Sequence, residues 1–193
     1  GPACIHFGVE GMKREALAFD TTVLESRIAV CYTGEPRNSG TNNWEITKRH
    51  IDGDNELFDI FEGIRDGALR LREAMLAADW DAVGEILRDA HPLRKRLSPH
   101  ITTPHMDDII DTALANGAIA SKVCGAGGGG CIAFFCEDGK RGSVEQAIAD
   151  MEVAVLVDHA GIAGAQPPVD NSRAGCLWLV EIAAHQQITA DDD

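Results

Sequence analysis

Residues 118–136 read AIASKVCGAGGGGCIAFFC, and this stretch decides the fold. Five glycines fall within residues 125–130, between the apolar segments Ala118–Val123 and Cys131–Cys136. Both segments are short, apolar and partly β-branched, so we predict two strands joined by a glycine-rich loop. The loop can be a tight hairpin turn. Alternatively, it can bring several backbone N–H groups close to one ligand, because glycine tolerates positive φ and has no Cβ.

The glycine-rich loop fits neither of the common nucleotide-binding patterns. It is not G-x-x-x-x-G-K-[ST], and it is not a G-x-G-x-x-G segment that opens a helix. The residues that follow it indicate a strand, which makes a P-loop a poor interpretation. Phosphate binding by the loop backbone and a plain hairpin turn both stay open on this pattern.

The N-terminal part of the sequence predicts strands. Three strand-like runs occupy residues 3–7, 12–19 and 27–32, and turn-forming residues separate them. They suggest an antiparallel meander.

The middle of the chain is helical. A short helix is predicted over residues 41–49, and an apolar stripe at helical spacing runs over residues 57–75. A further helix is expected over residues 81–97, with Pro92 kinking or dividing it. Another begins at Thr103 and Pro104, where Thr caps the helix and Pro occupies its first turn, and ends at residues 116–117.

The last quarter of the chain gives fewer signals. Ser143 and Gln146 have the S-x-x-Q form of a capping box, which predicts a helix that starts there. Residues 153–157 are ambiguous between helix and strand, residues 176–182 indicate a closing strand, and residues 190–193 are expected to be a disordered tail. The element order predicts one α+β domain over residues 1–193, with a mostly antiparallel sheet covered on one face by helices.

The charge of the chain limits the class of partner. The formal net charge is −14, which argues against a general nucleic-acid binder and against binding to an anionic membrane. It also opposes anionic substrates. Any phosphate site must therefore be locally basic or built from backbone N–H groups.

Cysteine usage indicates a reducing compartment. The six cysteines form no C-x-x-C motif, and most lie in apolar strand-like runs. The sequence shows no signal peptide and no apolar run of membrane-spanning length, so we expect buried free thiols in the cytoplasm. A structural zinc site is the alternative, but His91, His100 and His105 lack ligand spacing with any cysteine. We expect no metal-binding residues. His6, His50 and His185 have no recognisable partners in the sequence, so we interpret them as structural.

Residues 122–131, KVCGAGGGGC, resemble the third signature motif of the GHMP small-molecule kinases, the family of galactokinase, homoserine kinase and mevalonate kinase. Residues 32–40, YTGEPRNSG, resemble the Thr-Gly-x-x-Arg-x-Ser segment of the sugar-phosphate branch, typified by D-glycero-D-manno-heptose 7-phosphate kinase. Residues 95–98 and 102–104 also fit that branch. The resemblance covers roughly residues 1–136 in the order of the family.

Two motifs of this family are missing from the sequence. They are the nucleotide-binding motif Pro-x-x-x-Gly-Leu-Gly-Ser-Ser and the N-terminal substrate motif, and the catalytic aspartate of the family belongs just before residue 1. The resemblance therefore implies the C-terminal half of a kinase, with a fold related to the ferredoxin-like type. It also implies that the chain has no catalytic residue of its own and little or no activity alone.

The resemblance implies roles for several residues. It assigns the binding of the nucleotide phosphates to Gly125, Ala126, Gly127, Gly128 and Gly129. It assigns the sugar-phosphate acceptor to Arg37 and Ser39, whose guanidinium fork and hydroxyl can donate hydrogen bonds to a phosphate. Lys122 and Arg96 are further candidate substrate-binding residues.

Each candidate has a plainer interpretation. Lys122 can be an outward-facing strand residue, and the segment around Arg37 can be an ordinary surface turn. Arg96 belongs to the basic cluster of residues 94–96, which can simply complement the dipole at the C-terminus of a helix.

The implied reaction moves the γ-phosphoryl group of ATP to a hydroxyl of a sugar or sugar phosphate, such as a heptose 7-phosphate, with Mg²⁺ bridging the phosphates. ATP and Mg²⁺ would be bound mainly by an N-terminal half, encoded by the same gene or present as a separate chain. The alternative is a non-catalytic sugar-phosphate-binding or regulatory module. An apolar edge left exposed without the N-terminal half would also favour a homodimer.

Overall fold

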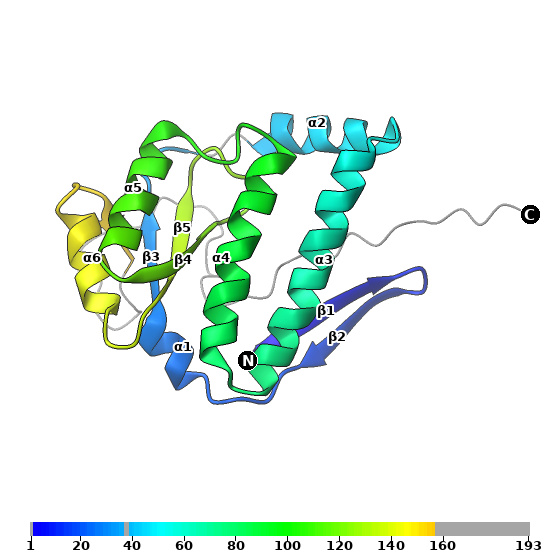
Figure 1. Cartoon of the computed structure of the whole chain (residues 1–193). Coiled ribbons are helices and arrows are strands. Elements are labelled where there is room, and N and C mark those ends of the chain that lie inside the picture. Colours follow the sequence, from blue (N-terminus) through cyan, green and yellow to red (C-terminus); the bar gives the residue numbers. More distant parts are fainter. Residues whose placement is uncertain (1, 37–38, 157–193) are drawn as a thin grey trace, which may run out of the picture.

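The computed structural model describes residues 2–36 and 39–156, with only the backbone described at residues 39–42. The predicted strand over residues 176–182, His185 and the predicted tail over residues 190–193 lie outside these ranges. The elements in chain order are β1 (Ala3–Gly8), β2 (Gly11–Ala16), α1 (Thr22–Arg27), β3 (Ile28–Tyr32), α2 (Ser39–Ile51), α3 (Asn55–Leu76), α4 (Trp80–Leu97), α5 (Pro104–Ala115), β4 (Ala118–Val123), β5 (Cys131–Cys136), α6 (Arg141–Ala149) and β6 (Ala154–Val155) (Figure 1). This is the α+β architecture that the sequence predicts.

Four strands form one antiparallel sheet in the order β4-β5-β3-β6. The strand β5 is internal: its Ile132 pairs with Val123 of β4, and its Cys131 pairs with Tyr32 of β3. The glycine-rich loop therefore lies at the end of β3 that carries Tyr32. The two strands that flank the loop have the bounds that the sequence predicts.

The strands β1 and β2 form a separate two-stranded hairpin, so the predicted meander over residues 3–32 is wrong. The chain does not pass directly from β2 to β3, because α1 intervenes. The carboxylate of Asp20 accepts hydrogen bonds from the backbone N–H of Thr22 at 3.0 Å and from its hydroxyl at 2.7 Å, at the start of α1. This short helix turns the chain away, and β3 pairs with β5 and β6 instead.

The sheet buries side chains on both of its faces. Phe134 of β5 lies in a hydrophobic cluster with α5 and α6, whereas Phe135 lies in a second cluster with α3 and α4. Because successive residues of a strand point to opposite faces, these two clusters lie on opposite sides of the sheet. Helices thus pack against both faces of the sheet. The sequence pattern predicted helices on one face alone, and that part of the prediction is wrong.

The long helices follow the apolar stripes of the sequence. Leu57, Ile60, Leu71 and Met75 of α3 are all buried, as their spacing predicts. The helix α4 is not divided at Pro92 but continues to Leu97. Tertiary contacts hold it on both sides of the proline: Val83 and Leu87 are buried before it, and Arg94 bonds to the sheet after it.

The sequence predicted the starts of α5 and α6 from capping residues, and only the start of α5 is correct. The hydroxyl of Thr103 accepts a hydrogen bond from the backbone N–H of Met106 at 3.2 Å, which confirms the predicted N-cap of α5. The prediction for α6 is wrong by two residues, because this helix begins at Arg141 and Ser143 lies inside it. The side chain of Arg141 bonds to Glu145 one turn later at 2.7 Å, which supports the earlier start.

Candidate functional site

The glycine-rich loop, residues 124–130, adopts a conformation that other residues rarely take. All five of its glycines have positive φ, between 69° and 137°. Two of them also lie against backbone. A Cβ on Gly127 would lie 2.5 Å from the carbonyl oxygen of Ile101, and one on Gly129 would lie 2.8 Å from that of Glu35. The sequence of the loop is therefore set by close packing as well as by backbone conformation.

Two connecting segments hold the loop between them. The backbone N–H of Gly128 donates to the carbonyl of Ile101 at 3.1 Å, in the connection between α4 and α5. The backbone N–H of Gly130 donates to the carbonyl of Glu35 at 2.8 Å, and that of Thr33 donates to the carbonyl of Gly130 at 2.9 Å. The structure thus brings together the three segments singled out in the sequence: residues 33–36, the connection before α5 and the glycine-rich loop.

Arg94 is a site residue that the sequence analysis missed. Its guanidinium donates to the carbonyl of Val123 at 2.7 Å and to that of Gly125 at 2.8 Å, so it fixes the entrance of the loop. Burial lowers the pKa of Arg94 from its ordinary value. In the sequence Arg94 is one of three consecutive basic residues, and nothing in their order marks which of them turns toward the loop.

Four backbone N–H groups of the loop have no hydrogen-bond acceptor in the part of the chain that the structure describes. They are those of Gly125, Ala126, Gly127 and Gly129. Successive backbone N–H groups in turn conformations of this kind form concave binding sites for anions. The residues present therefore fit the phosphates of a nucleotide without requiring a cluster of basic side chains.

The other two basic residues at the end of α4 form surface ion pairs. Lys95 donates to Asp107 at 2.8 Å, and Arg96 donates to Glu56 at 3.1 Å. Both pairs are exposed, and such pairs contribute little to stability. To contact a substrate as predicted, Arg96 would therefore have to break its ion pair with Glu56.

The remaining candidates are only partly placed. Lys122 lies on β4, paired with Ala133, immediately before the turn into the loop. Ser39 is the first residue of α2 and is described by its backbone alone, and Arg37 lies outside the described residues. Their assignment to the phosphate acceptor stays a prediction.

A second polar cluster lies on the β1–β2 hairpin, far from the loop in sequence. The ligand atoms of Cys4, His6 and Glu15 lie within 4.8 Å of one another, a spacing that could hold a metal ion. His6, which the sequence showed without a recognisable partner, bonds to Glu15 at 2.9 Å. Both oxygens of the Glu15 carboxylate also accept hydrogen bonds from Arg72 of α3. This cluster is best described as the attachment of the hairpin to α3.

Comparisons with known proteins place the glycine-rich loop within a region that matches a known family. A family model described as GHMP kinases C terminal matches residues 71–153, which include α4, α5 and the glycine-rich loop. The chain is 27% identical over 125 residues to D-glycero-alpha-D-manno-heptose 7-phosphate kinase of Campylobacter jejuni. The aligned region covers 65% of this chain and 36% of that protein. It is also 27% identical over 118 residues to the bifunctional fucokinase/GDP-fucose pyrophosphorylase of Arabidopsis thaliana, covering 61% of this chain and 11% of the relative.

A solved structure supports the fold. L. major mevalonate kinase in complex with R-mevalonate superimposes with a TM-score of 0.65 at 16% identity, over 76% of this chain and 44% of that one. At this identity the likeness shows the fold alone. The chain spans about a third of the length of the bacterial relative and less than half of the mevalonate kinase.

Proposed function

We propose that this chain, which carries a GHMP kinase C-terminal domain over residues 71–153, is part of an ATP-dependent kinase that phosphorylates a sugar or sugar phosphate. One observation carries the proposal: the glycine-rich loop is fixed by backbone contacts on two sides, and four of its backbone N–H groups donate no hydrogen bond to another residue that the structure describes. The names of the two relatives, a heptose 7-phosphate kinase and a fucokinase, give a sugar or sugar phosphate as the acceptor, which supports a sugar-type acceptor here. A heptose 7-phosphate is the acceptor that we propose.

The loop would hold phosphate oxygens of the nucleotide. Phosphoryl transfer depends on positioning and on charge stabilisation more than on covalent chemistry. The N–H groups of Gly125, Ala126, Gly127 and Gly129 supply donors that need no rearrangement, because the contacts of Gly128 and Arg94 already set the shape of the loop. A backbone site also avoids the problem of attracting an anion to a chain of net charge −14.

We assign the rest of the reaction to an N-terminal half of the same kinase. ATP supplies the phosphoryl group, and Mg²⁺ would offset its charge. The base, the Mg²⁺ ligands and the main nucleotide-binding loop would belong to that other half. Arg37, Ser39, Arg96 and Lys122 would contact the acceptor in the assembled enzyme.

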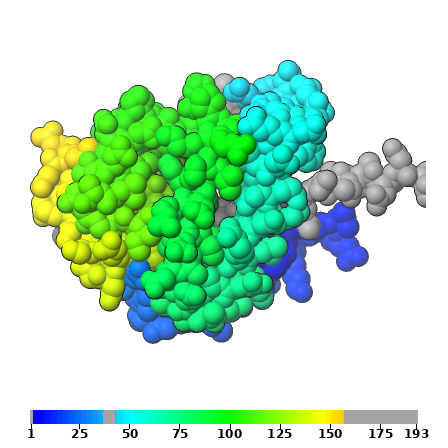
Figure 2. All heavy atoms as spheres, viewed as in Figure 1, coloured from blue at the N-terminus to red at the C-terminus, as the bar shows by residue number. Residues whose placement is uncertain are grey.

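Two lesser proposals accompany this one. The β1–β2 hairpin exposes Phe7, Val9 and Met12, with Val9 91% exposed, and it projects beyond α3 in Figure 2. We propose that the isolated chain self-associates through this apolar surface. We also propose a cytoplasmic location, which the free thiols of all five described cysteines support. No helix in the described ranges is long and apolar enough to cross a membrane.

The test is release of ADP from ATP and Mg²⁺ in the presence of a panel of sugar phosphates. It would compare this chain, purified free of any partner, with the longest product of the same locus. We expect turnover in the longer product alone, with a heptose 7-phosphate as acceptor. Turnover by this chain alone would overturn the assignment to two halves. Silence in both proteins, with sugar-phosphate binding retained, would indicate a non-catalytic binding module instead.

A pair of variants in the longer product tests the role of the loop. Gly127→Ala places a Cβ against Ile101, whereas Gly142→Ala lies in α6, where the added Cβ has no described atom within 4 Å apart from its adjacent residues and the backbone of its own helix. We expect the first variant to lose turnover and the second to retain it. Equal turnover in both would contradict a role for the loop.

A further inference from the structure

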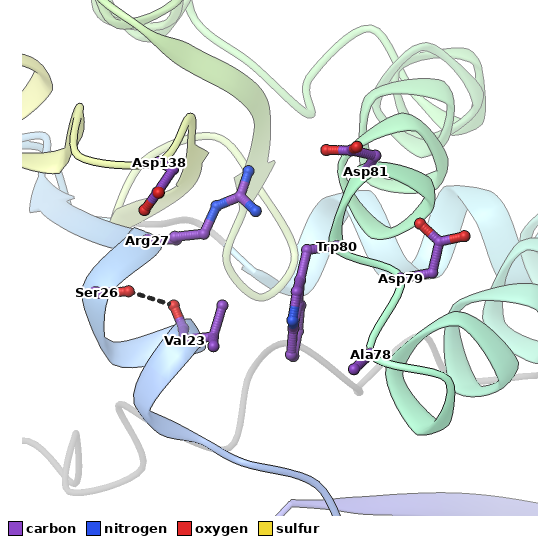
Figure 3. Close-up of a pocket in the computed structure, with 8 residues that line it drawn as sticks. All are labelled: Val23, Ser26, Arg27, Ala78, Asp79, Trp80, Asp81 and Asp138. Carbon is purple, nitrogen blue, oxygen red and sulfur yellow. Dashed lines mark hydrogen bonds between the residues drawn. The ribbon is translucent and has the colours of Figure 1, made fainter.

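A pocket of about 480 Å³ lies at the opposite end of the sheet from the glycine-rich loop. The strand β3 begins at Ile28, beside the pocket residue Arg27, and ends at Tyr32, beside the loop. At about 3.3 Å per residue, its five residues separate the two sites by roughly 15 Å. The lining residues come from α1, from the α3–α4 connection and the start of α4, and from the turn after β5: Val23, Ser26, Arg27, Ala78, Asp79, Trp80, Asp81 and Asp138 (Figure 3).

Arg27 is the unusual residue of this pocket. It is only 7% exposed, and its Nε donates to the carbonyl of Cys136 at 2.8 Å, while its guanidinium lies 4.4 Å from the ring centroid of Phe135. Its two Nη nitrogens donate no hydrogen bond to a residue in the described ranges. Both Nη nitrogens keep some exposure to solvent. In the view of Figure 3, the guanidinium lies between Asp138 and Asp81.

Arg27 has few protein partners for a side chain that is only 7% exposed. A buried charged group is ordinarily paired or fully hydrogen-bonded, because its lost hydration is otherwise uncompensated. Arg27 has an anchor at Nε and a ring beneath it, so its orientation is fixed. Its four remaining N–H bonds at the two Nη nitrogens are available to a group inside the pocket.

The other walls supply complementary chemistry. Trp80 is half-buried, and its ring meets that of Phe19 edge-on, with centroids 5.8 Å apart and an interplanar angle of 68°. Asp79 uses one carboxylate oxygen to cap α4, where it accepts from the backbone N–H of Ala82 at 3.0 Å. Asp81 and Asp138 are exposed at the pocket, where they offer acceptors only. The pocket thus combines an indole ring, a fixed donor and acceptor carboxylates.

These groups discriminate between classes of ligand. An anion would meet the carboxylates of Asp81 and Asp138 in a chain of net charge −14, and a cation would meet Arg27. A neutral polyol can bind both the positively charged Arg27 and the negatively charged carboxylates, because each hydroxyl can accept a hydrogen bond from an Nη nitrogen and donate one to a carboxylate. A ring with an apolar C–H face can also lie against the indole. We propose that this pocket binds an uncharged, unphosphorylated sugar, at a site separate from the glycine-rich loop.

The experiment uses the chain as it exists, labelled with ¹⁵N, and follows the indole N–H signal of Trp80 by NMR during titration. The probes are glucose, mannose and galactose, with glucosamine and glucuronate as charged analogues. We expect at least one neutral sugar to shift the Trp80 signal with a Kd in roughly the millimolar range, and both charged analogues to bind more weakly.

A matched pair of variants locates the binding. Asp138→Ala removes an exposed carboxylate at the pocket, and Asp52→Ala removes one in the turn after α2, where it pairs with Lys48 at the surface. We expect about tenfold weaker binding for the first variant and unchanged binding for the second. Thermal unfolding of both variants checks that they fold.

Three outcomes would overturn the proposal. The first is that no neutral sugar shifts the Trp80 signal. The second is that glucuronate or glucosamine binds best, which would make the pocket a site for a charged ligand. The third is that Asp138→Ala and Asp52→Ala bind equally well. The proposal is independent of phosphoryl transfer, since neither the probes nor the readout involves ATP.

Discussion

Gly127 and Ile101 are in such close contact that a Cβ on Gly127 would lie 2.5 Å from the Ile101 carbonyl oxygen and 2.8 Å from its Cα. This single contact ties the loop between β4 and β5 to the connection between α4 and α5. Because both partners are backbone, neither can move aside as a flexible side chain could. The contact makes the glycine a requirement of the fold as well as of the proposed phosphate site.

The first prediction concerns this contact. Gly127→Ala should lower the free energy of unfolding by about 2 kcal/mol or more, because the new methyl group meets fixed backbone and φ is +86°. Gly142→Ala, in helix α6, adds a methyl group that no other described part of the protein approaches within 4 Å, and it should leave the free energy of unfolding unchanged or raise it by up to about 1 kcal/mol. Urea unfolding measures both. Similar midpoints for the two variants would show that the loop is not packed as described.

The second prediction concerns Arg94. Arg94→Ala should lower the free energy of unfolding by about 2 kcal/mol, because the carbonyls of Val123 and Gly125 lose their shared donor. Arg94→Lys should recover only part of this loss, since an ammonium lacks the planar fork that reaches both oxygens. Arg96→Ala, which removes an exposed pair with Glu56, is the control, with an expected change of under about 1 kcal/mol. A larger loss for Arg96→Ala than for Arg94→Ala would contradict the assignment.

The third prediction is a pH dependence. Hydrogen bonds from Arg72 and then from His6 lower the pKa of Glu15 from 4.5 to about 2. A carboxylate with a depressed folded-state pKa stabilises the protein above its unfolded pKa, and this contribution is lost as pH falls through the folded pKa. The stability difference between the parent chain and Glu15→Gln should therefore be constant above pH 4.5 and shrink between pH 4.5 and 2. Glu10→Gln, at the exposed hairpin turn, should show no such change, and a difference independent of pH for Glu15→Gln would count against the pairing.

The fourth prediction concerns the start of α5. Thr103→Ala should cost about 1 kcal/mol, because it removes the acceptor for the Met106 N–H. Thr103→Ser keeps the hydroxyl and should cost much less. Thermal unfolding of the two variants decides whether the cap or the methyl group of Thr103 matters.

The parts of the fold that the sequence predicted correctly are set by local signals. The two strands around the glycine-rich loop end where apolar residues give way to glycine, and α5 begins at a Thr-Pro pair whose capping chemistry involves only near neighbours. The apolar stripe of α3 was also readable, because one face of a helix repeats in the sequence.

Apart from the start of α6, the errors arose where partners are distant in the sequence. The strand β3 resembled the third strand of a meander, but its partner β5 lies about a hundred residues later. Arg94 resembled its neighbours Lys95 and Arg96, and only the packing of α4 beside β4 distinguishes it. The pocket around Arg27 gave no signal, since three separate segments form it.

The placement of β5 inside the sheet has a consequence for synthesis on the ribosome. Ile28 pairs with Phe135, 107 residues later, so β3 emerges long before its partner exists. At roughly 5–20 residues per second this interval lasts about 5–20 s. The hairpin β1–β2 and the pair α3–α4 can form during that time, but the apolar side chains of β3 stay without their sheet. The nascent chain is therefore exposed to misassociation until β5 has left the exit tunnel.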